Sequence, residues 1–265
     1  MKIDLTGRAA LVTGSGAGIG LAIAAGLHGA GATVVVHDLT QERAEAAVAS
    51  LGGGDRLRAV ATDAGSAEGC AALIEQVPQV DVLVNNVGFG KMDPVWDIPD
   101  AEWDRIFQVN VMSGVRLSRH YLPKMAEQGW GRAVFVASEA GVHIPKEMVH
   151  YGVSKAAVMA VARGFAESLP GTGVTVNSVL PGPTRTEATN TILRRLVDDR
   201  VLEAETVDDA AAQLLASPGW QSSLIGRWMQ PEEVANLVVY LASEQASATT
   251  GTAVRVEGGV VRSVT

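Results

Sequence analysis

The sequence is short of several residue types, and each shortage narrows the class of protein. Only one of its 265 residues is a cysteine, Cys70, so no disulfide can form within the chain. Such sparing use of cysteine is typical of proteins from a reducing compartment. The setting Gly69-Cys70-Ala-Ala-Leu-Ile resembles the buried face of a helix. We therefore expect a buried thiol and not a reactive one.

Basic residues and long apolar runs are also scarce. Lysine and arginine number 21 against 29 acidic residues, giving a net charge of −8 and a pI near 5.1. This balance argues against nucleic acid or an anionic membrane as a partner, because both need basic clusters. No apolar run reaches the roughly 18 residues of a membrane span, and the first residues lack the apolar core of a signal peptide. These absences predict a soluble, cytoplasmic protein.

Metal-ligand spacing is missing as well. The five histidines show no pattern such as H-x-x-x-H, so we expect no metal site.

Short apolar segments alternate with longer, helix-like segments along the whole chain. Near-continuous apolar runs suit strands of a parallel sheet that is buried on both faces. The predicted strands are Ala9–Thr13, Thr33–Asp38, Arg56–Ala61, Val80–Asn85, Arg132–Ala137, Val174–Leu180 and Ala253–Val256. The predicted helices are Ile19–Ala30, Glu42–Leu51, Ala67–Glu75, Glu102–Glu127, Tyr151–Glu167 and Glu232–Ala242. This alternation predicts one α/β domain over residues 1–265, a doubly wound, Rossmann-like parallel sheet of about seven strands with helices on both faces.

One segment interrupts this alternation. Residues 183–226 contain no clear strand, are rich in charge and alanine, and include Trp220. A long excursion in a compact domain is usually a lid or a binding loop, and disorder is the alternative. We expect a lid over the substrate, and its apolar and arginine side chains are compatible with either an apolar ketone or a carboxylate.

A glycine-rich turn follows the first predicted strand: Thr13-Gly14-Ser-Gly-Ala-Gly18-Ile-Gly20. Glycines here allow a tight turn and a close approach of a pyrophosphate to backbone N–H groups at a helix start. The spacing is G-x-x-x-G-x-G and not G-x-G-x-x-G, and no Gly-Lys-Ser/Thr follows, which excludes a P-loop. A turn with no ligand is the alternative for this motif taken alone.

Asp38 ends the second predicted strand, 24 residues after Gly14. A carboxylate at this point can accept hydrogen bonds from ribose hydroxyls and would repel a 2′-phosphate. Leu39 follows it, and the next basic residue is Arg43. The pattern favours NAD over NADP, with a simple helix N-cap as the alternative role for Asp38.

Ser138, Tyr151 and Lys155 form the third motif. Residues four apart lie on one face of a helix, so Tyr151 and Lys155 are expected to lie together at the start of a predicted helix. A phenol with a pKa near 10 is a poor acid or base at neutral pH, and a nearby ammonium would lower that pKa. Ser138, at the end of a predicted strand, could meet the same substrate oxygen. A Tyr-x-x-x-Lys pair alone is common by chance on helices.

Taken together, these motifs resemble those of the short-chain dehydrogenase/reductase (SDR) family, over nearly the whole chain. The matching residues, in order, are Thr13 to Gly20, Asp63, Asn85-Asn86-Val87-Gly88, Asn110, Ser138, Tyr151, Lys155 and Pro181-Gly182-Pro183-Thr184.

The resemblance implies a role for each matching residue. It makes Tyr151 the general acid or base, Ser138 the group that holds the substrate oxygen, and Lys155 a ligand of the nicotinamide ribose that also lowers the pKa of Tyr151. Asn110 would hold a kinked turn and a water next to Lys155. The implied catalytic set is Asn110, Ser138, Tyr151 and Lys155.

The same resemblance extends the cofactor site. Asp63 and Ala64 would meet the adenine, the segment from Asn86 to Gly88 would lie beneath the adenosine, and Pro181 to Thr184 would hold the carboxamide. The complete expected set is Gly14, Ser15, Gly18, Ile19, Gly20, Asp38, Leu39, Asp63, Ala64, Asn86, Gly88, Tyr151, Lys155, Pro181, Gly182 and Thr184.

Departures from the family pattern are few. Glu139 follows Ser138, where a second small residue is frequent, and we expect its carboxylate to point outward rather than to bind a polar substrate group. His143 and His150 are expected to line or solvate the pocket without chemistry. Relatives are commonly homotetramers, so a tetramer or dimer is expected here.

The resulting hypothesis is an oxidoreductase that transfers a hydride between NAD(H) and a small secondary alcohol or ketone. Two alternatives stay open: an NADPH-dependent 3-oxoacyl-thioester reductase, and a dinucleotide-binding sensor without turnover. Sugars, polyols, steroids and hydroxy acids all stay open as substrates.

Overall fold

The structure is a computed structural model, and it describes residues 2–216 and 223–264. Among these residues lies one seven-stranded sheet in the order β3-β2-β1-β4-β5-β6-β7, in which every neighbouring pair is parallel. The strands are β1 (Ala9–Val12), β2 (Thr33–Asp38), β3 (Leu57–Ala61), β4 (Val82–Asn85), β5 (Gly131–Val136), β6 (Val174–Pro181) and β7 (Ala253–Val256). The predicted doubly wound, Rossmann-like sheet is confirmed, and each predicted strand is present within two residues of its expected ends.

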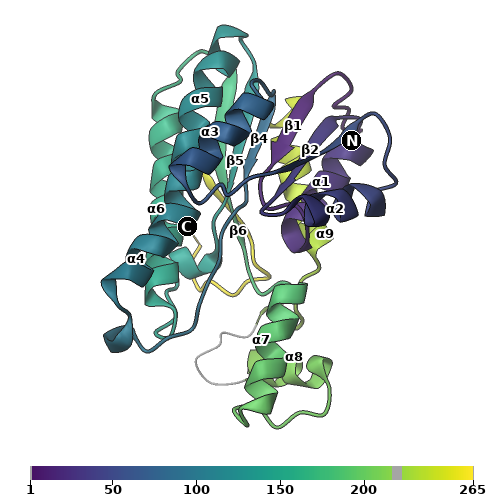
Figure 1. Ribbon diagram of the computed structural model, residues 1–265. Helices are drawn as coiled ribbons and strands as arrows, with labels where there is room; N and C mark the ends of the chain where they lie inside the picture. The colour runs from purple at the N-terminus through teal and green to yellow at the C-terminus, as the bar shows by residue number, and fades with distance from the viewer. Residues whose placement is uncertain (1, 217–222, 265) are drawn as a thin grey trace.

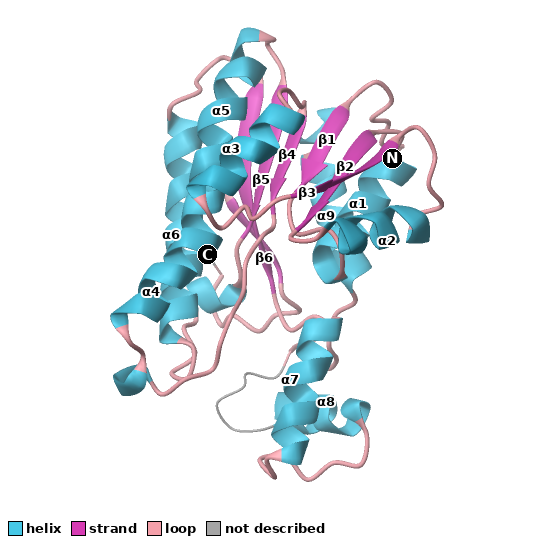
Figure 2. Ribbon diagram, in the orientation of Figure 1, coloured by secondary structure: helices cyan, strands magenta, loops and turns pink. Residues whose placement is uncertain are grey.

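Helices cover both faces of this sheet (Figures 1 and 2). The helices are α1 (Gly18–Gly29), α2 (Gln41–Ser50), α3 (Ala67–Gln76), α4 (Asp100–Phe107), α5 (Ser113–Glu127), α6 (Val149–Glu167), α7 (Glu187–Asp198), α8 (Val207–Ala216) and α9 (Pro231–Leu241), with 3-10 turns η1 (Val95–Asp97), η3 (Glu139–Gly141) and η4 (Glu244–Ala246). One core packs α1 and α9 on one face, and a second packs α3, α5 and α6 on the other. No helix in the described ranges is long and apolar enough to cross a membrane.

Alternating side chains of each strand supply the two cores. In β1, Ala10 and Val12 enter one core while Leu11 enters the other. In β2, Val34 and Val36 likewise enter the first core, and Val35 enters the second. Because successive side chains point to opposite faces and both faces are covered, the central strands β1 and β4 are almost wholly apolar, which is why they can be recognised in the sequence.

The predicted helix Glu102–Glu127 is interrupted. A π-helical turn, η2 (Gln108–Met112), separates α4 from α5. Asn110 lies in this turn, is 5% exposed, and bonds both its amide oxygen and nitrogen to the backbone of Phe89. Single-turn π-helical bulges are frequent at functional sites, and this one directs a polar side chain into the molecule.

The segment predicted as a lid contains α7 and α8 and, among its described residues, no strand. These helices lie below the end of the sheet (Figure 1). With neighbouring loop residues they form a separate small core of Leu193, Leu202, Ala210, Ala211, Leu214, Leu215 and Trp228. Thr186 caps α7 by accepting a hydrogen bond from the Thr189 amide at 3.1 Å. Trp220, which belongs to the segment predicted as a lid, lies outside the described residues.

Candidate active site

The predicted site residues follow the carboxyl ends of the strands. The glycine-rich turn follows β1, Asp38 ends β2, Asp63 follows β3, and Asn86 and Gly88 follow β4. Ser138 comes after β5, and the segment that reaches Thr184 leaves β6. Since all strands are parallel, these ends meet at one edge of the sheet, where open α/β folds bind ligands.

The glycine-rich turn is built as a cofactor turn requires. Gly14 (φ +64°) and Gly18 (φ +56°) occupy the left-handed region, which favours glycine. A Cβ on Gly20 would lie 2.3 Å from the Gly14 carbonyl oxygen and 2.5 Å from Asn86 Nδ2. Asn86 donates from that nitrogen to the carbonyls of Thr13 (2.8 Å) and Gly14 (3.0 Å). The turn is therefore fixed onto the end of β4, and it leaves no room for side chains where a pyrophosphate would approach.

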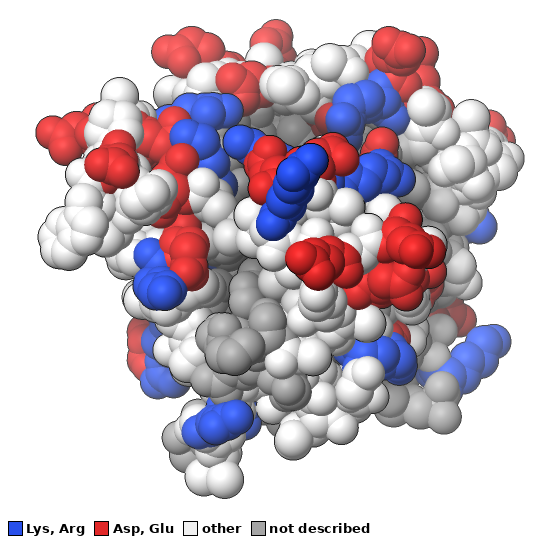
Figure 3. Space-filling model, turned by 90° about the horizontal axis from the view of Figure 1, so that it is seen from below, with Lys and Arg blue, Asp and Glu red and all other residues white. Residues whose placement is uncertain are grey.

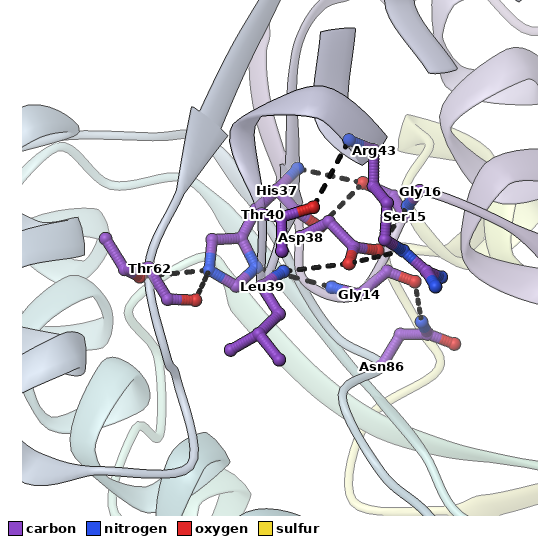
Figure 4. Close-up of polar contacts among 10 residues, drawn as sticks. All are labelled: Gly14, Ser15, Gly16, His37, Asp38, Leu39, Thr40, Arg43, Thr62 and Asn86. Atoms are coloured by element: carbon purple, nitrogen blue, oxygen red, sulfur yellow. Dashed lines mark hydrogen bonds and ion pairs between the residues drawn. The ribbon is translucent and has the colours of Figure 1, made fainter. Parts of the chain in front are cut away.

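Ser15 and Ile19 contribute less directly. The Ser15 hydroxyl donates to the Val12 carbonyl (2.7 Å) and accepts from the His37 amide (3.0 Å), while its own amide donates to the His37 carbonyl (2.8 Å). Ser15 thus holds the turn against β2, as Figure 4 shows. Ile19 packs against the core beside α1.

Asp38 lies beside the turn (Figure 4). Its Oδ2 accepts from the Gly16 amide at 3.0 Å, and its Oδ1 accepts from the Leu39 amide at 2.8 Å. Thr40 is the N-cap of α2, so the N-cap alternative for Asp38 is wrong. Arg43 forms an ion pair with Asp38 Oδ1 at 2.9 Å, a contact that the sequence analysis did not weigh. The signal was present, because Arg43 lies in the first turn of the helix that follows Asp38.

The buried His37 is a second residue that sequence reasoning missed. Its Nε2 lies 3.1 Å from the Thr62 carbonyl and 3.0 Å from the Thr62 hydroxyl, and its Nδ1 accepts from the Gly14 amide at 3.4 Å. Burial lowers the pKa of His37, so the neutral imidazole is favoured. His37 thereby links the glycine-rich turn to the loop that carries Asp63.

The predicted adenine residues lie on that loop. Asp63 is exposed, and its Oδ1 accepts from the Gly65 amide at 2.9 Å. Ala64 is buried, whereas Leu39 exposes 64% of its surface. Leu39 therefore offers an apolar surface next to Asp38.

Asn110, Lys155 and Gly88 lie together at the end of the site that carries Ser138 and Tyr151, the reaction end. Asn110 Nδ2 donates to Ser154 Oγ at 2.9 Å, next to Lys155 on α6. Lys155 Nζ donates to the Val136 carbonyl at 2.8 Å. A Cβ on Gly88 would lie 3.1 Å from Lys155 Nζ and 3.3 Å from Asn110 Oδ1, so both side chains border this glycine.

The expected lowering of the Tyr151 pKa by Lys155 is wrong. Burial, with a further contribution from Glu139, raises the pKa of Tyr151 to about 12. Burial lowers the pKa of Lys155 to about 8, against the opposing effect of Glu139. The ammonium is committed to the Val136 carbonyl and lies 5.7 Å from the centre of the Tyr151 ring, while the Glu139 carboxylate destabilises a phenolate.

Glu139 turns inward, against the expectation that it points outward. The Ser138 hydroxyl donates to Glu139 Oε2 at 2.5 Å and accepts from the Ala140 amide at 3.1 Å, as the cap of η3. Burial raises the pKa of Glu139, and the charge of Glu257, which follows β7, raises it further. The residue after the serine is therefore part of the reaction end.

The remaining predicted residues serve the frame around the site. The Thr184 hydroxyl donates to the Gly182 carbonyl at 2.8 Å, and a Cβ on Gly182 would lie 2.6 Å from the Glu257 carbonyl oxygen. His150 is fully buried and contacts the ring of Trp103 at 5.9 Å between ring centroids, so it does not solvate the pocket. His143 is exposed in the loop before α6.

Charge on the surrounding surface is mixed. Seen from the α7–α8 end, acidic and basic side chains are interspersed, and no broad basic area is visible on this face (Figure 3).

Comparison with known proteins places these motifs in a family. The profile of the family described as short chain dehydrogenase matches residues 8–196. The uncharacterized oxidoreductase YvaG of Bacillus subtilis (strain 168) is 43% identical over 100% of both chains. The 3-oxoacyl-[acyl-carrier-protein] reductase FabG of Aquifex aeolicus (strain VF5) is 32% identical over 98% of this chain and 100% of that one.

A solved structure agrees with the sequence relatives. L-Sorbose reductase from Gluconobacter frateurii, complexed with NADPH and L-sorbose, superposes with a TM-score of 0.89 at 32% identity, over 100% of both chains. The chain is therefore a member of the short-chain dehydrogenase family and an oxidoreductase.

Proposed function

We propose that this protein transfers a hydride between NAD(H) and a secondary alcohol or ketone. The observation that carries the proposal is the convergence of Ser138, Tyr151, Lys155 and Asn110 beside a glycine-rich turn that fits a dinucleotide. The nicotinamide would supply or accept the hydride, and the protein's own groups would hold the substrate and move one proton.

Tyr151 is suited to give that proton. With a pKa raised to about 12, its phenol holds the proton at neutral pH. It is therefore ready as the acid in ketone reduction, whereas alcohol oxidation requires the phenolate and would be favoured by higher pH. Lys155 would orient the nicotinamide ribose, and its ammonium would stabilise the phenolate once it forms.

The preference for NAD rests on Asp38. Asp38 is 7% exposed and its carboxylate accepts from the Gly16 amide, where ribose hydroxyls could also donate to it and a 2′-phosphate would be repelled. Arg43 weakens this selection, because it neutralises part of the Asp38 charge. We therefore expect NADH to bind more tightly, with measurable binding of NADPH.

Neutral, hydroxyl-rich substrates suit the reaction end best. The Glu139 carboxyl lies beside Ser138 and acts on Tyr151, and when ionised it would accept hydrogen bonds from hydroxyls and repel an anionic substrate at that end. Similarity to the structure of L-sorbose reductase with NADPH and L-sorbose supports the same class of substrate. Sugar ketones and polyols are therefore placed ahead of hydroxy acids and steroids.

An NADPH-dependent 3-oxoacyl-thioester reductase is the second candidate. Relatives named as such reductases are about one third identical to this chain, and Arg43 could attract a 2′-phosphate. A sensor without turnover is disfavoured, because Asn110, Ser138, Tyr151 and Lys155 are all present.

The test is a turnover screen at constant enzyme concentration. L-Sorbose, other ketoses and acetoacetyl thioesters would be reduced with NADH and NADPH, and sorbitol and simple secondary alcohols oxidised with NAD⁺ and NADP⁺. Faster NADH-linked turnover of ketoses or polyols supports the proposal. Faster NADPH-linked reduction of the thioester would replace it with the second candidate, and NADH binding without any turnover would favour the sensor.

A further inference from the structure

The single proton of the Ser138 hydroxyl is already in use. Ser138 Oγ accepts from the Ala140 amide at 3.1 Å and donates to Glu139 Oε2 at 2.5 Å. An ionised carboxylate can only accept a hydrogen bond, so the Ser138 hydroxyl must direct its proton at Glu139. The remaining lone pair of Ser138 Oγ can then only accept, either from the Tyr151 hydroxyl, which also interacts with Ser138, or from a ligand.

A protonated Glu139 reverses this arrangement. A carboxylic acid can donate its own proton to Ser138 Oγ, which frees the serine proton for a substrate oxygen. A ketone oxygen needs a donor, whereas an alcohol can donate to an acceptor. Ser138 therefore offers the substrate a hydrogen-bond donor when Glu139 is protonated and an acceptor when Glu139 is ionised.

We infer that Glu139 is a positioning residue that sets the direction of the Ser138 hydrogen bond. With Glu139 protonated, Ser138 donates and favours the ketone; with Glu139 ionised, Ser138 accepts and favours the alcohol. The inference rests on the proposed function for its substrate class. Hydride transfer to the carbonyl carbon and proton transfer from Tyr151 to the oxygen are unchanged, since Ser138 and Glu139 only redistribute one hydrogen bond.

Several ionisable groups around Glu139 act on its protonation. Tyr151 and Lys155 face it from α6, and Glu257 faces it from the end of β7. Burial raises the pKa of Glu139, and Glu257 adds to the rise, while the Ser138 hydrogen bond opposes it. Glu139 therefore takes up a proton at a higher pH than an ordinary carboxyl. Its charge also raises the pKa of Tyr151, so the serine and the tyrosine respond to the same group.

The first arm of the test needs no substrate. Infrared difference spectra, recorded on the full-length protein as pH falls, would follow the carbonyl band of protonated carboxyls. The wild type should show a band that grows in above the usual glutamate pKa of about 4.3, and Glu139→Gln should lack it. The control, Glu147→Gln, changes a glutamate of the same loop that pairs with Lys146, and it should keep the band. Absence of the band from the wild type, or its persistence in Glu139→Gln, would overturn the inference.

The second arm measures ketone binding, with L-sorbose as the probe at saturating NADH. As pH rises through the transition that the infrared band reports, the wild-type KM should rise by about fivefold, the value of one hydrogen bond. Glu139→Gln keeps a donor toward Ser138, so its KM should stay low and independent of pH. In a Ser138→Ala background, the Glu139→Gln change should have no effect on KM, as a merely structural role would not predict.

The outcomes of the second arm separate the two proposals. A parallel pH dependence of KM in wild type and Glu139→Gln would contradict the role of Glu139 while leaving the proposed function intact. No turnover of L-sorbose or of the wider screen, together with the infrared band, would count against the proposed function, and Glu139 would still be shown to change protonation state beside Ser138.

Discussion

At the scale of single residues, burial and not the neighbouring Lys155 ammonium determines the direction in which the pKa of Tyr151 is shifted. Tyr151 keeps its proton because a buried phenolate beside Glu139 is costly, and Lys155 is held by a backbone carbonyl. A Tyr-x-x-x-Lys pattern predicts which groups lie together, but the protonation state depends on contacts that only the fold supplies.

Replacing Tyr151 by phenylalanine tests its role as proton carrier. The ring and its packing are kept while the transferable proton is removed, so turnover should fall by at least about a thousandfold, within the usual contribution of acid–base catalysis. NADH affinity, followed by nicotinamide fluorescence, should stay within about twofold. A large loss of NADH binding would instead assign Tyr151 to the cofactor site.

Replacing Asp38 by asparagine tests cofactor selection. The amide keeps an acceptor for the Gly16 N–H and removes the charge that repels a 2′-phosphate, while Arg43 is released from its ion pair. The ratio of NADPH to NADH dissociation constants should fall by about tenfold. Asp55→Asn, at an exposed aspartate in another loop, is the control. An unchanged ratio would remove Asp38 as the selector.

At the scale of elements, the turn between β1 and α1 shows why glycine is required. A Cβ at Gly20 would overlap the Gly14 carbonyl and Asn86, whereas one at Gly29, at the other end of α1, meets no atom within 4 Å. Gly20→Ala should therefore destabilise the protein by about 1–3 kcal/mol and weaken NADH binding.

The matched variant for that prediction is Gly29→Ala. It should leave NADH binding unchanged and keep or increase stability, by up to about 1 kcal/mol, since alanine favours helix. Chemical denaturation and NADH titration of both variants provide the measurements. Equal effects of the two substitutions would contradict a specific role of the turn.

The strands and the order of the motifs could be predicted from the sequence, because most strands are buried on both faces and each motif lies at or after the end of a strand. The break between α4 and α5 could not, since the π-helical turn depends on the bonds of Asn110 to Phe89, which lies 21 residues earlier. The inward Glu139 was likewise hidden, because side-chain direction depends on tertiary contacts. Helices α7 and α8 were missed because their small core of leucines and alanines gives a weak pattern in a charged segment.

At the scale of the whole molecule, His37 links stability to pH. Its pKa is lowered by burial, with Thr62, Asp38 and Asp63 opposing the effect. As pH falls below the ordinary histidine value of about 6.5, the unfolded chain takes up a proton before the folded chain does, so the free energy of unfolding should fall until His37 itself titrates. His37→Asn should lose this part of the slope in denaturation curves recorded across the range. The exposed control His143→Asn should keep it, and parallel curves for wild type and His37→Asn would contradict the assignment.

Assembly is a further prediction at this scale. We expect a homotetramer, and light scattering should then give a mass of about 110 kDa, four times the 27.6 kDa chain. A mass equal to that of one chain would contradict it.

The most direct measurement is a titration of the purified wild-type protein with NADH and with NADPH, followed by nicotinamide fluorescence. Tighter binding of NADH is the predicted result, because Asp38 faces the expected ribose position and Arg43 only partly offsets its charge. Tighter binding of NADPH would contradict the cofactor assignment and advance the thioester reductase. Binding of neither would contradict the proposed hydride transfer, while leaving the fold and the family as described.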